Sequence, residues 1–115
     1  MKQDAKLLRI FAGESDRVHH QPLYEAIVHK ARKCHMAGAT VWRGIMSYGP
    51  SSRIHTANLL DLSSDLPVII EITDDEEKIE AFLPKLDELF ETSKCGGLVT
   101  IENVKVVRYR YGERE

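Results

Sequence analysis

Cysteine is scarce in this chain, and so are long apolar runs. Cys34 and Cys95 are the only cysteines, which excludes a disulfide framework and predicts free thiols. No stretch approaches the roughly 18 apolar residues of a membrane helix, and the apolar run near the N-terminus is too short for a signal peptide. We therefore expect a cytoplasmic protein that does not insert into a membrane.

Excess charge of one sign is also missing. The 16 Lys and Arg residues nearly balance the 18 Asp and Glu residues, for a formal net charge of −2. Binding to nucleic acid usually goes with a strongly basic surface, so we expect no nucleic-acid partner. A length of 115 residues suits one compact unit. We expect a single domain over residues 1–115.

Strand and helix patterns alternate along the chain. Two-residue periodicity over residues 6–12 puts Leu8, Ile10 and Ala12 on one face of a strand, opposite Leu7, Arg9 and Phe11. Residues 39–48, 66–73 and 98–111 also have strand character, with Gly44 marking either a bulge or a close backbone approach. Helical spacing recurs after Pro22 and again after a capping pattern at Thr73, where the apolar stripe comprises Ile79, Phe82, Leu83, Leu86, Leu89 and Phe90.

The predicted order β-α-β-β-α-β is typical of an α+β ferredoxin-like sandwich. In that fold a four-stranded antiparallel sheet carries both helices on one face. The chain's own helices then leave the other sheet face uncovered, and homo-oligomerisation is the simplest way to cover its apolar residues. The fold by itself does not fix a function.

A segment over residues 47–65 joins the second and third predicted strands. It is too long for a hairpin turn, and loops of this length in compact domains are often functional. Two interpretations stay open, a solvated loop or an anion site built from hydroxyl, guanidinium and imidazole groups. The residues concerned are Ser51, Ser52, Arg53, His55 and Thr56.

Arg108 and Arg110 fall on one face of the last predicted strand, about 7 Å apart from the strand rise. Two guanidinium groups at this spacing suit a di- or triphosphate, while charges that protect an edge strand from pairing are the alternative. Gly96 and Gly97, just before that strand, allow backbone N–H groups to approach a phosphate, although turns use the same pair.

Catalytic and metal-binding patterns are absent from the sequence. His19, His20, His29 and His35 show no metal-ligand spacing, and no nucleophile with a matched base can be identified. We therefore expect a protein that is not an enzyme, has no metal site and requires no cofactor.

Several stretches resemble a PII-like family of uncharacterised bacterial and archaeal proteins. They are GESDR, PLYEAIVHKAR, AGATVWRGI, SSRIHTA, LSSDLPVIIEI and GGLVTIE, which together span nearly the whole chain. That family is similar to the PII nitrogen-regulatory proteins. The resemblance implies a cytoplasmic homotrimer that binds adenine nucleotides between subunits and contacts a protein partner through the long loop. A transporter or channel is the partner class suggested by analogy.

The resemblance also implies particular nucleotide-binding residues. Arg108 and Arg110 match the Arg-x-Arg that meets phosphate in PII proteins, while Thr40, Tyr48 and Gly49 match the segments around the second strand. Gly96 and Gly97 match a phosphate-binding loop only in part, because Gly97 stands where PII proteins carry a lysine. The loss of that cation favours AMP or ADP over ATP, with Arg53 as the candidate replacement.

The leading hypothesis is thus a trimeric regulatory protein that relays adenine-nucleotide binding to a partner through residues 47–65. One alternative is a metal-responsive trimer resembling copper-tolerance proteins, in which His19, His20 and His55 converge across a subunit boundary. Another alternative is a small enzyme acting on a phosphate ester or anhydride.

Overall fold

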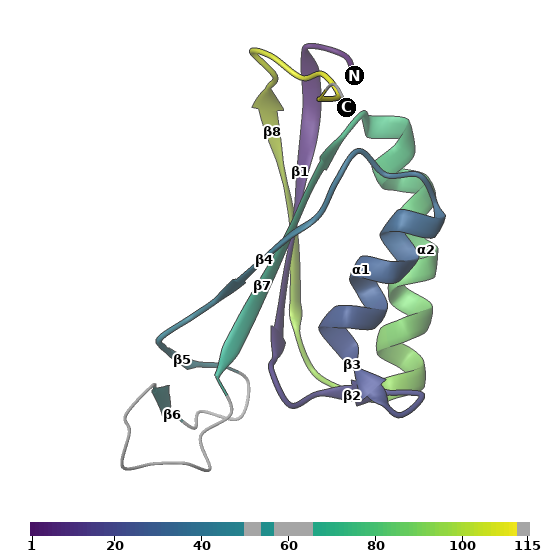
Figure 1. Cartoon of the computed structure of the whole chain (residues 1–115). Helices are drawn as coiled ribbons and strands as arrows, with labels where there is room; N and C mark the ends of the chain where they lie inside the picture. The colour runs from purple at the N-terminus through teal and green to yellow at the C-terminus, as the bar shows by residue number, and fades with distance from the viewer. Residues whose placement is uncertain (50–53, 57–65, 113–115) are drawn as a thin grey trace.

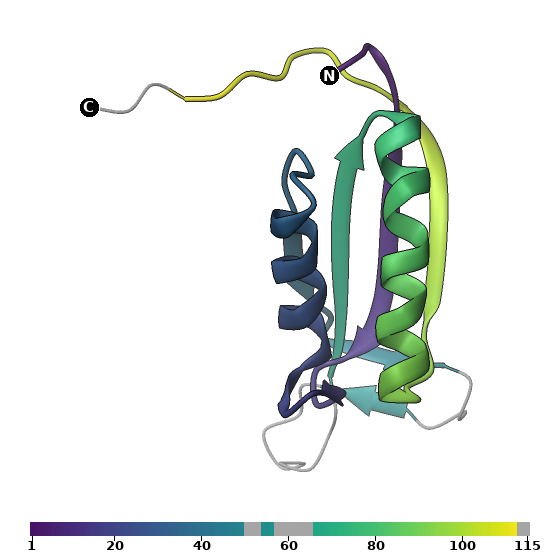
Figure 2. The ribbon, with the colours of Figure 1, turned by 90° about the vertical axis from the view of Figure 1, so that its right-hand side faces the viewer.

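The computed structural model describes residues 1–49, 54–56 and 66–112. It has two layers, an antiparallel four-stranded sheet and a pair of helices packed on one face of it (Figures 1 and 2). The α+β ferredoxin-like prediction is confirmed. Arg53, Ser51 and Ser52 lie outside the described residues.

The sheet has the strand order β4-β7-β1-β8, with two-stranded pairs β2-β3 and β5-β6 outside it. The elements are β1 Asp4–Gly13, β2 Arg17–Val18, β3 Gln21–Pro22, α1 Leu23–Lys33, β4 Thr40–Arg43, β5 Met46–Tyr48, β6 Ile54–Thr56, β7 Pro67–Asp74, α2 Glu76–Ser93 and β8 Leu98–Lys105.

The core lies between the sheet and the helices. Leu8, Ile10 and Ala12 of β1 point into it, as the two-residue periodicity predicts, and their β7 partners Ile72, Ile70 and Val68 do the same. The helices contribute one buried stripe each: Leu23, Ala26, Ile27 and Ala31 from α1, and Ile79, Phe82, Leu86 and Leu89 from α2. Leu83 and Phe90, expected in the α2 stripe, are only half-buried at its margin.

Two parallel rows of side chains cross the opposite face of the sheet, which we call the open face. Backbone register places one residue from each strand in line, giving an apolar row of Trp42, Ile69, Phe11 and Leu98. The adjacent row is polar, with Thr40, Glu71, Arg9 and Thr100. Trp42 and Leu98 are each 57% exposed, so the apolar row lacks a cover within the described part of the chain.

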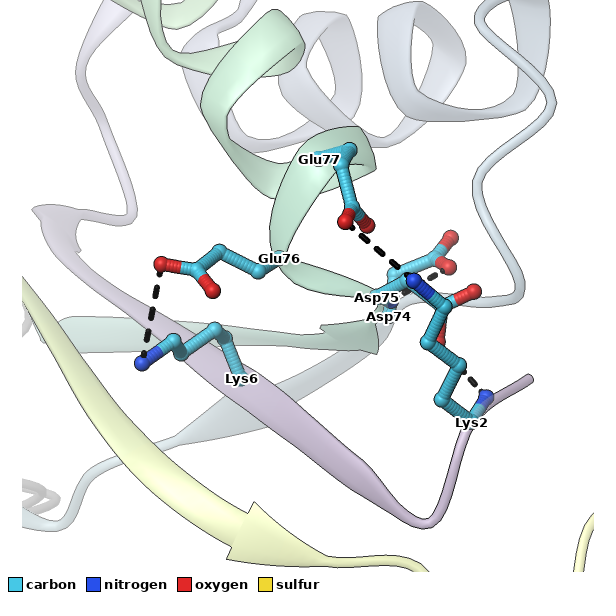
Figure 3. Close-up of polar contacts among 6 residues, drawn as sticks. All are labelled: Lys2, Lys6, Asp74, Asp75, Glu76 and Glu77. Carbon is cyan, nitrogen blue, oxygen red and sulfur yellow. Dashed lines mark hydrogen bonds and ion pairs between the residues drawn. The ribbon is translucent and has the colours of Figure 1, made fainter.

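The junction of β7 and α2 is fixed by carboxylates (Figure 3). Buried Asp74 accepts hydrogen bonds from Ala37 N at 2.9 Å and Asp75 N at 2.7 Å, while Asp75 Oδ1 accepts one from Lys2 N at 2.7 Å. Lys2 also pairs with Glu77, and hydrogen bonding by the Glu77 backbone and by Lys2 lowers the pKa of that carboxyl. The predicted capping role of Thr73 is wrong, because β7 continues to Asp74 and the helix begins at Glu76.

Two strand predictions are too long, for related reasons. The 39–48 strand is divided into β4 and β5, since β7 begins at Pro67 and pairing ends where Gly44 N donates to Pro67 O at 2.8 Å. A Cβ at Gly44 would lie 2.6 Å from Pro67 Cγ, which confirms the close approach expected there. The last strand ends at Lys105, opposite Asp4, because β1 offers no further partner.

Gly97 is the glycine that packing most plainly requires at the start of β8. A Cβ there would stand 2.7 Å from Phe11 O and 2.8 Å from the Phe90 ring. We expect Gly97→Ala to lower the free energy of unfolding by about 1–3 kcal/mol, because the backbone of β1 and a half-buried ring must move apart. Urea denaturation measures this loss.

Gly96 is the matched control, since a Cβ added there meets nothing within 4 Å. Gly96→Ala should leave the unfolding free energy within about 0.5 kcal/mol of wild type. Equal stability of the two variants would contradict the close packing described at Gly97.

Candidate functional site

A charged network occupies the centre of the open face. Arg9 Nε donates to Glu71 Oε2 at 2.9 Å, and Arg9 Nη1 donates to Glu102 Oε1 at 2.5 Å. Trp42 Nε1 donates to the second oxygen of Glu71 at 2.7 Å. The hydrogen bonds that Arg9 donates to Glu71 and then to Glu102 raise the pKa of its guanidinium, which stays cationic. Glu71 therefore fixes both a guanidinium and an indole on the open face.

Beside this network lies a hollow of about 450 Å³, which we call the open-face hollow. Its lining brings together one end of the sheet, the segment before β4 and the C-terminal segment: Met1, Leu7, Ala37, Gly38, Ala39, Thr40, Trp42, Glu71, Thr73, Val106, Arg108 and Tyr109. It combines an indole, a carboxylate, a hydroxyl and a guanidinium. These are groups suited to a planar ring and an attached anion.

The C-terminal segment after β8 leaves the sheet and crosses its end toward α1 (Figure 2). Val106 N donates to Gln3 O at 2.7 Å, and the Tyr109 hydroxyl donates to Ala37 O at 3.2 Å. Tyr111 packs edge-on against the Tyr109 ring, with centroids 5.7 Å apart. Partial burial and the Tyr111 contact raise the pKa of the Tyr109 hydroxyl, so it remains a neutral donor.

Arg108 and Arg110 are therefore not on one face of a strand, and that prediction is wrong. Both belong to the irregular segment beyond Lys105, where two-residue alternation does not apply. Arg108 lines the open-face hollow, whereas Arg110 is exposed and does not. Thr40 lines the same hollow, so two of the expected nucleotide-binding residues come together.

Gly96 and Gly97 lie at the other end of β8. They line a separate groove of about 620 Å³ between α2 and β8, together with Leu83, Leu86, Asp87, Phe90, Cys95 and Val99. The 8 residues of β8, at roughly 3.3 Å each, span about 26 Å, with Gly96 and Gly97 before one end of this strand and Arg108 beyond the other. One chain therefore cannot bring the two sets of expected residues onto one small ligand.

The segment expected to act as a long loop begins as a hairpin arm. Tyr48 of β5 pairs with Ile54 of β6, and Ser47 pairs with His55, so His55 and Thr56 are strand residues. The pair β5-β6 extends beyond the sheet at the end opposite the chain termini (Figure 1). Tyr48 and Gly49 are exposed there, away from the open-face hollow.

Sequence reasoning selected Thr40 and Arg108 of the hollow lining but missed Trp42, Glu71 and Tyr109. Arg9 was placed on the open face by strand periodicity, but nothing in the linear pattern pairs it with Glu71 and Glu102. Neither Trp42 nor Tyr109 was assigned a role from the sequence. Register across β4, β7 and β1 is the missing information, because it aligns Thr40, Glu71 and Arg9 in one row.

Histidines form no metal centre within residues 1–49 and 66–112. No group of three or more His, Cys, Asp or Glu side chains in the described part of the chain is placed to hold a metal ion. No helix among the described residues is long and apolar enough to cross a membrane.

Comparison with known proteins connects this geometry to a family. Residues 5–106 match the model of DUF190, described as Uncharacterized ACR, COG1993. A UPF0166 protein of Aquifex aeolicus is 40% identical over 102 residues, covering 89% of this chain and 92% of that protein. A UPF0166 protein of Methanocaldococcus jannaschii is 36% identical over 104 residues, covering 90% of this chain and 93% of that protein.

A solved structure shares the fold. CPII, a nitrogen regulatory PII-like protein from Thiomonas intermedia K12 bound to ADP, AMP and bicarbonate, superposes with a TM-score of 0.69. The match covers 91% of this chain and 90% of that chain at 18% identity. The likeness shows a PII-like fold.

The hydrogen bond between Trp42 and Glu71 can be tested with the chain's single tryptophan. We expect Glu71→Ala to lower the fluorescence anisotropy of Trp42, because the indole loses its acceptor and gains freedom. Glu71→Gln keeps an oxygen acceptor and should remain close to wild type. Equal anisotropy in the Ala variant and wild type would contradict a held indole.

Proposed function

This chain belongs to the DUF190 family, and we propose that it is a PII-like regulatory protein that binds an adenine nucleotide in sites between subunits. The observation that carries the proposal is the separation of the expected binding residues. Thr40 and Arg108 line the open-face hollow, whereas Gly96 and Gly97 lie at the other end of β8, a strand roughly 26 Å long. Two copies placed side by side can join the hollow of one to the glycines of the next.

The nucleotide fits the groups available. Trp42 offers an exposed aromatic surface for a base, Thr40 offers a hydroxyl, and Arg108 offers a fork of donors for phosphate. Arg110, two residues along the same irregular segment, supplies a second guanidinium without requiring a strand face. Gly97 occupies the position of the PII lysine, which favours AMP or ADP over ATP.

The open face supports assembly as a homotrimer. The apolar row exposes Trp42 and Leu98, and beside it Arg9 is ion-paired within the chain to both Glu71 and Glu102. Burying such a face against two further copies removes apolar surface from water without stranding an unpaired charge. The same packing brings the subunits together around the nucleotide sites.

The segment of residues 47–65 would contact the protein partner and so transmit the signal. The β5-β6 pair extends from the sheet (Figure 1), and Tyr48 and Gly49 are exposed at the end of β5. A nucleotide bound between subunits shifts the conformational population of this segment through its differential contacts, and a protein partner binds one arrangement. By analogy with PII proteins, a transporter or channel is the partner class proposed. Catalysis plays no part in this proposal.

Calorimetric titration tests the nucleotide. We expect ADP and AMP to bind more tightly than ATP, and Arg108→Ala plus Arg110→Ala to raise the Kd for ADP at least about tenfold, because charge-assisted hydrogen bonds to phosphate are lost. Arg32→Ala plus Lys94→Ala removes two exposed cations elsewhere and should bind like wild type.

A mixing experiment tests assembly of the site between subunits. Gly96→Glu is sterically free but places a carboxylate beside the phosphate, so this variant alone should not bind ADP. Mixed oligomers of this variant and the Arg108→Ala, Arg110→Ala variant should bind ADP again. In them, the arginines of a Gly96→Glu chain can meet the native Gly96 of a neighbouring arginine-variant chain. No recovery in mixed oligomers of confirmed composition would refute the shared site.

Leu98→Asp tests the trimer. A carboxylate in the apolar row cannot be buried without a partner, so we expect a monomer by analytical ultracentrifugation. Val107→Asp is the control, since Val107 is 92% exposed and lies outside the row. A wild-type chain that sediments as a monomer would contradict the assembly directly.

A further inference from the structure

A cationic groove runs between the two helices, remote from the open face. Its volume is about 380 Å³, and the turn between β2 and β3 contributes to its wall. The charged and titratable side chains that line it are His19 from that turn, His29, Lys30 and Lys33 from α1, and Lys85 and Glu88 from α2. We call this site the helix groove.

The cations of the helix groove are unpaired within the part of the chain that the structure describes. The side chains of Lys30, Lys33 and Lys85 make no ion pair or hydrogen bond with any described residue, and Glu88 is the one acid in the lining. Lys33 and Lys85 also line an adjoining hollow of about 320 Å³, so they stand between the two. The chain as a whole has a net charge of −2, which makes this local excess of positive charge a property of the groove.

Lys78, in the same region, is a lysine whose ammonium group already has hydrogen-bond partners. It lines the adjoining hollow, but its Nζ donates to Cys34 O at 3.2 Å and His35 O at 2.8 Å, where it closes the C-terminal end of α1. Lys30 and Lys33 have no such partner, although they lie three residues apart on one helix face and repel each other. The groove therefore keeps like charges together at a cost in stability.

The turn beside the groove is held in an uncommon conformation. His19 and His20 both have positive φ, 49° and 66°, a region that residues with a side chain seldom occupy. Arg17 Nη2 donates to His20 O at 2.7 Å and fixes the turn, which leaves His19 in the groove lining opposite the lysines. Backbone strain of this kind persists where the position of a side chain matters.

We propose that the helix groove is a second binding site, for a compact polyanion that carries two or more phosphate groups. Lysine ammonium groups bind phosphate as point charges, and three of them with one opposing carboxylate leave a net attraction for a di-anion or higher. No tryptophan, tyrosine, phenylalanine or arginine belongs to the groove lining, so only the small imidazole rings of His19 and His29 could stack on a nucleic-acid base. The ligand is thus identified by its phosphates alone.

Inorganic pyrophosphate is the probe for this site, titrated by calorimetry at constant ionic strength. We expect saturable binding to wild type, and at least about a tenfold higher Kd for Lys33→Gln plus Lys85→Gln, because two of the three lysines are lost. Lys94→Gln plus Lys105→Gln changes the net charge equally at exposed positions outside the groove and should bind like wild type. Amide shifts of Ala26 and Leu89 should follow the titration by NMR.

A further variant distinguishes pyrophosphate binding in the helix groove from binding at the proposed nucleotide site. Arg108→Ala plus Arg110→Ala should bind pyrophosphate like wild type, since neither arginine belongs to the lining of the helix groove. Loss of binding in that variant, equal weakening in the two lysine pairs, or no saturable binding to wild type would each overturn the second site. None of these results bears on ADP binding by wild type.

Stability provides an independent readout. Without an anion, Lys33→Gln plus Lys85→Gln should melt at or above the Tm of wild type, because repulsion is relieved. Pyrophosphate should raise the Tm of wild type and leave that of the variant unchanged. A Tm increase of equal size in both proteins would contradict binding at the lysines.

Discussion

Two helices can bury only one face of a four-stranded sheet, and the organisation of this molecule depends on that limit. The covered face takes the aliphatic side chains of β1 and β7 into a continuous core. The other face is exposed to water, and the proposed assembly requires it to accept protein contact as well. The Arg9 network with Glu71 and Glu102 meets both needs, because charges that are already paired lose less on leaving water.

The strand and helix order was predictable because each element carries its own periodicity. Leu8, Ile10 and Ala12 identify the buried side of β1 without any knowledge of the sheet. Element ends were not predictable in the same way, since they depend on the partner strand. Residues after Lys105 keep strand-like composition, yet β1 begins at Asp4 and leaves them no backbone to pair with.

The candidate site was harder to predict from the sequence than the fold, for a similar reason. Arg108 and Gly97 are close in the sequence and match neighbouring parts of a family motif, which suggested one site. The extended conformation of β8 separates them in space, although only eleven positions separate them in the sequence. Trp42 and Glu71 show the converse, because 29 residues separate two side chains that share a hydrogen bond. Residues 50–53 and 57–65 carry the remaining predictions, including Arg53, and lie outside the described residues.

The start of β1 and the end of β8 lie at the same end of the sheet, as the register pair Asp4 and Lys105 requires (Figure 1). Met1 is part of the lining of the open-face hollow, and the backbone N–H of Lys2 is bound to Asp75. A purification tag joined to Met1 would therefore stand next to the hollow, where it competes with any ligand for space. Even a short sequence left ahead of Met1 would extend from a residue of the hollow lining itself.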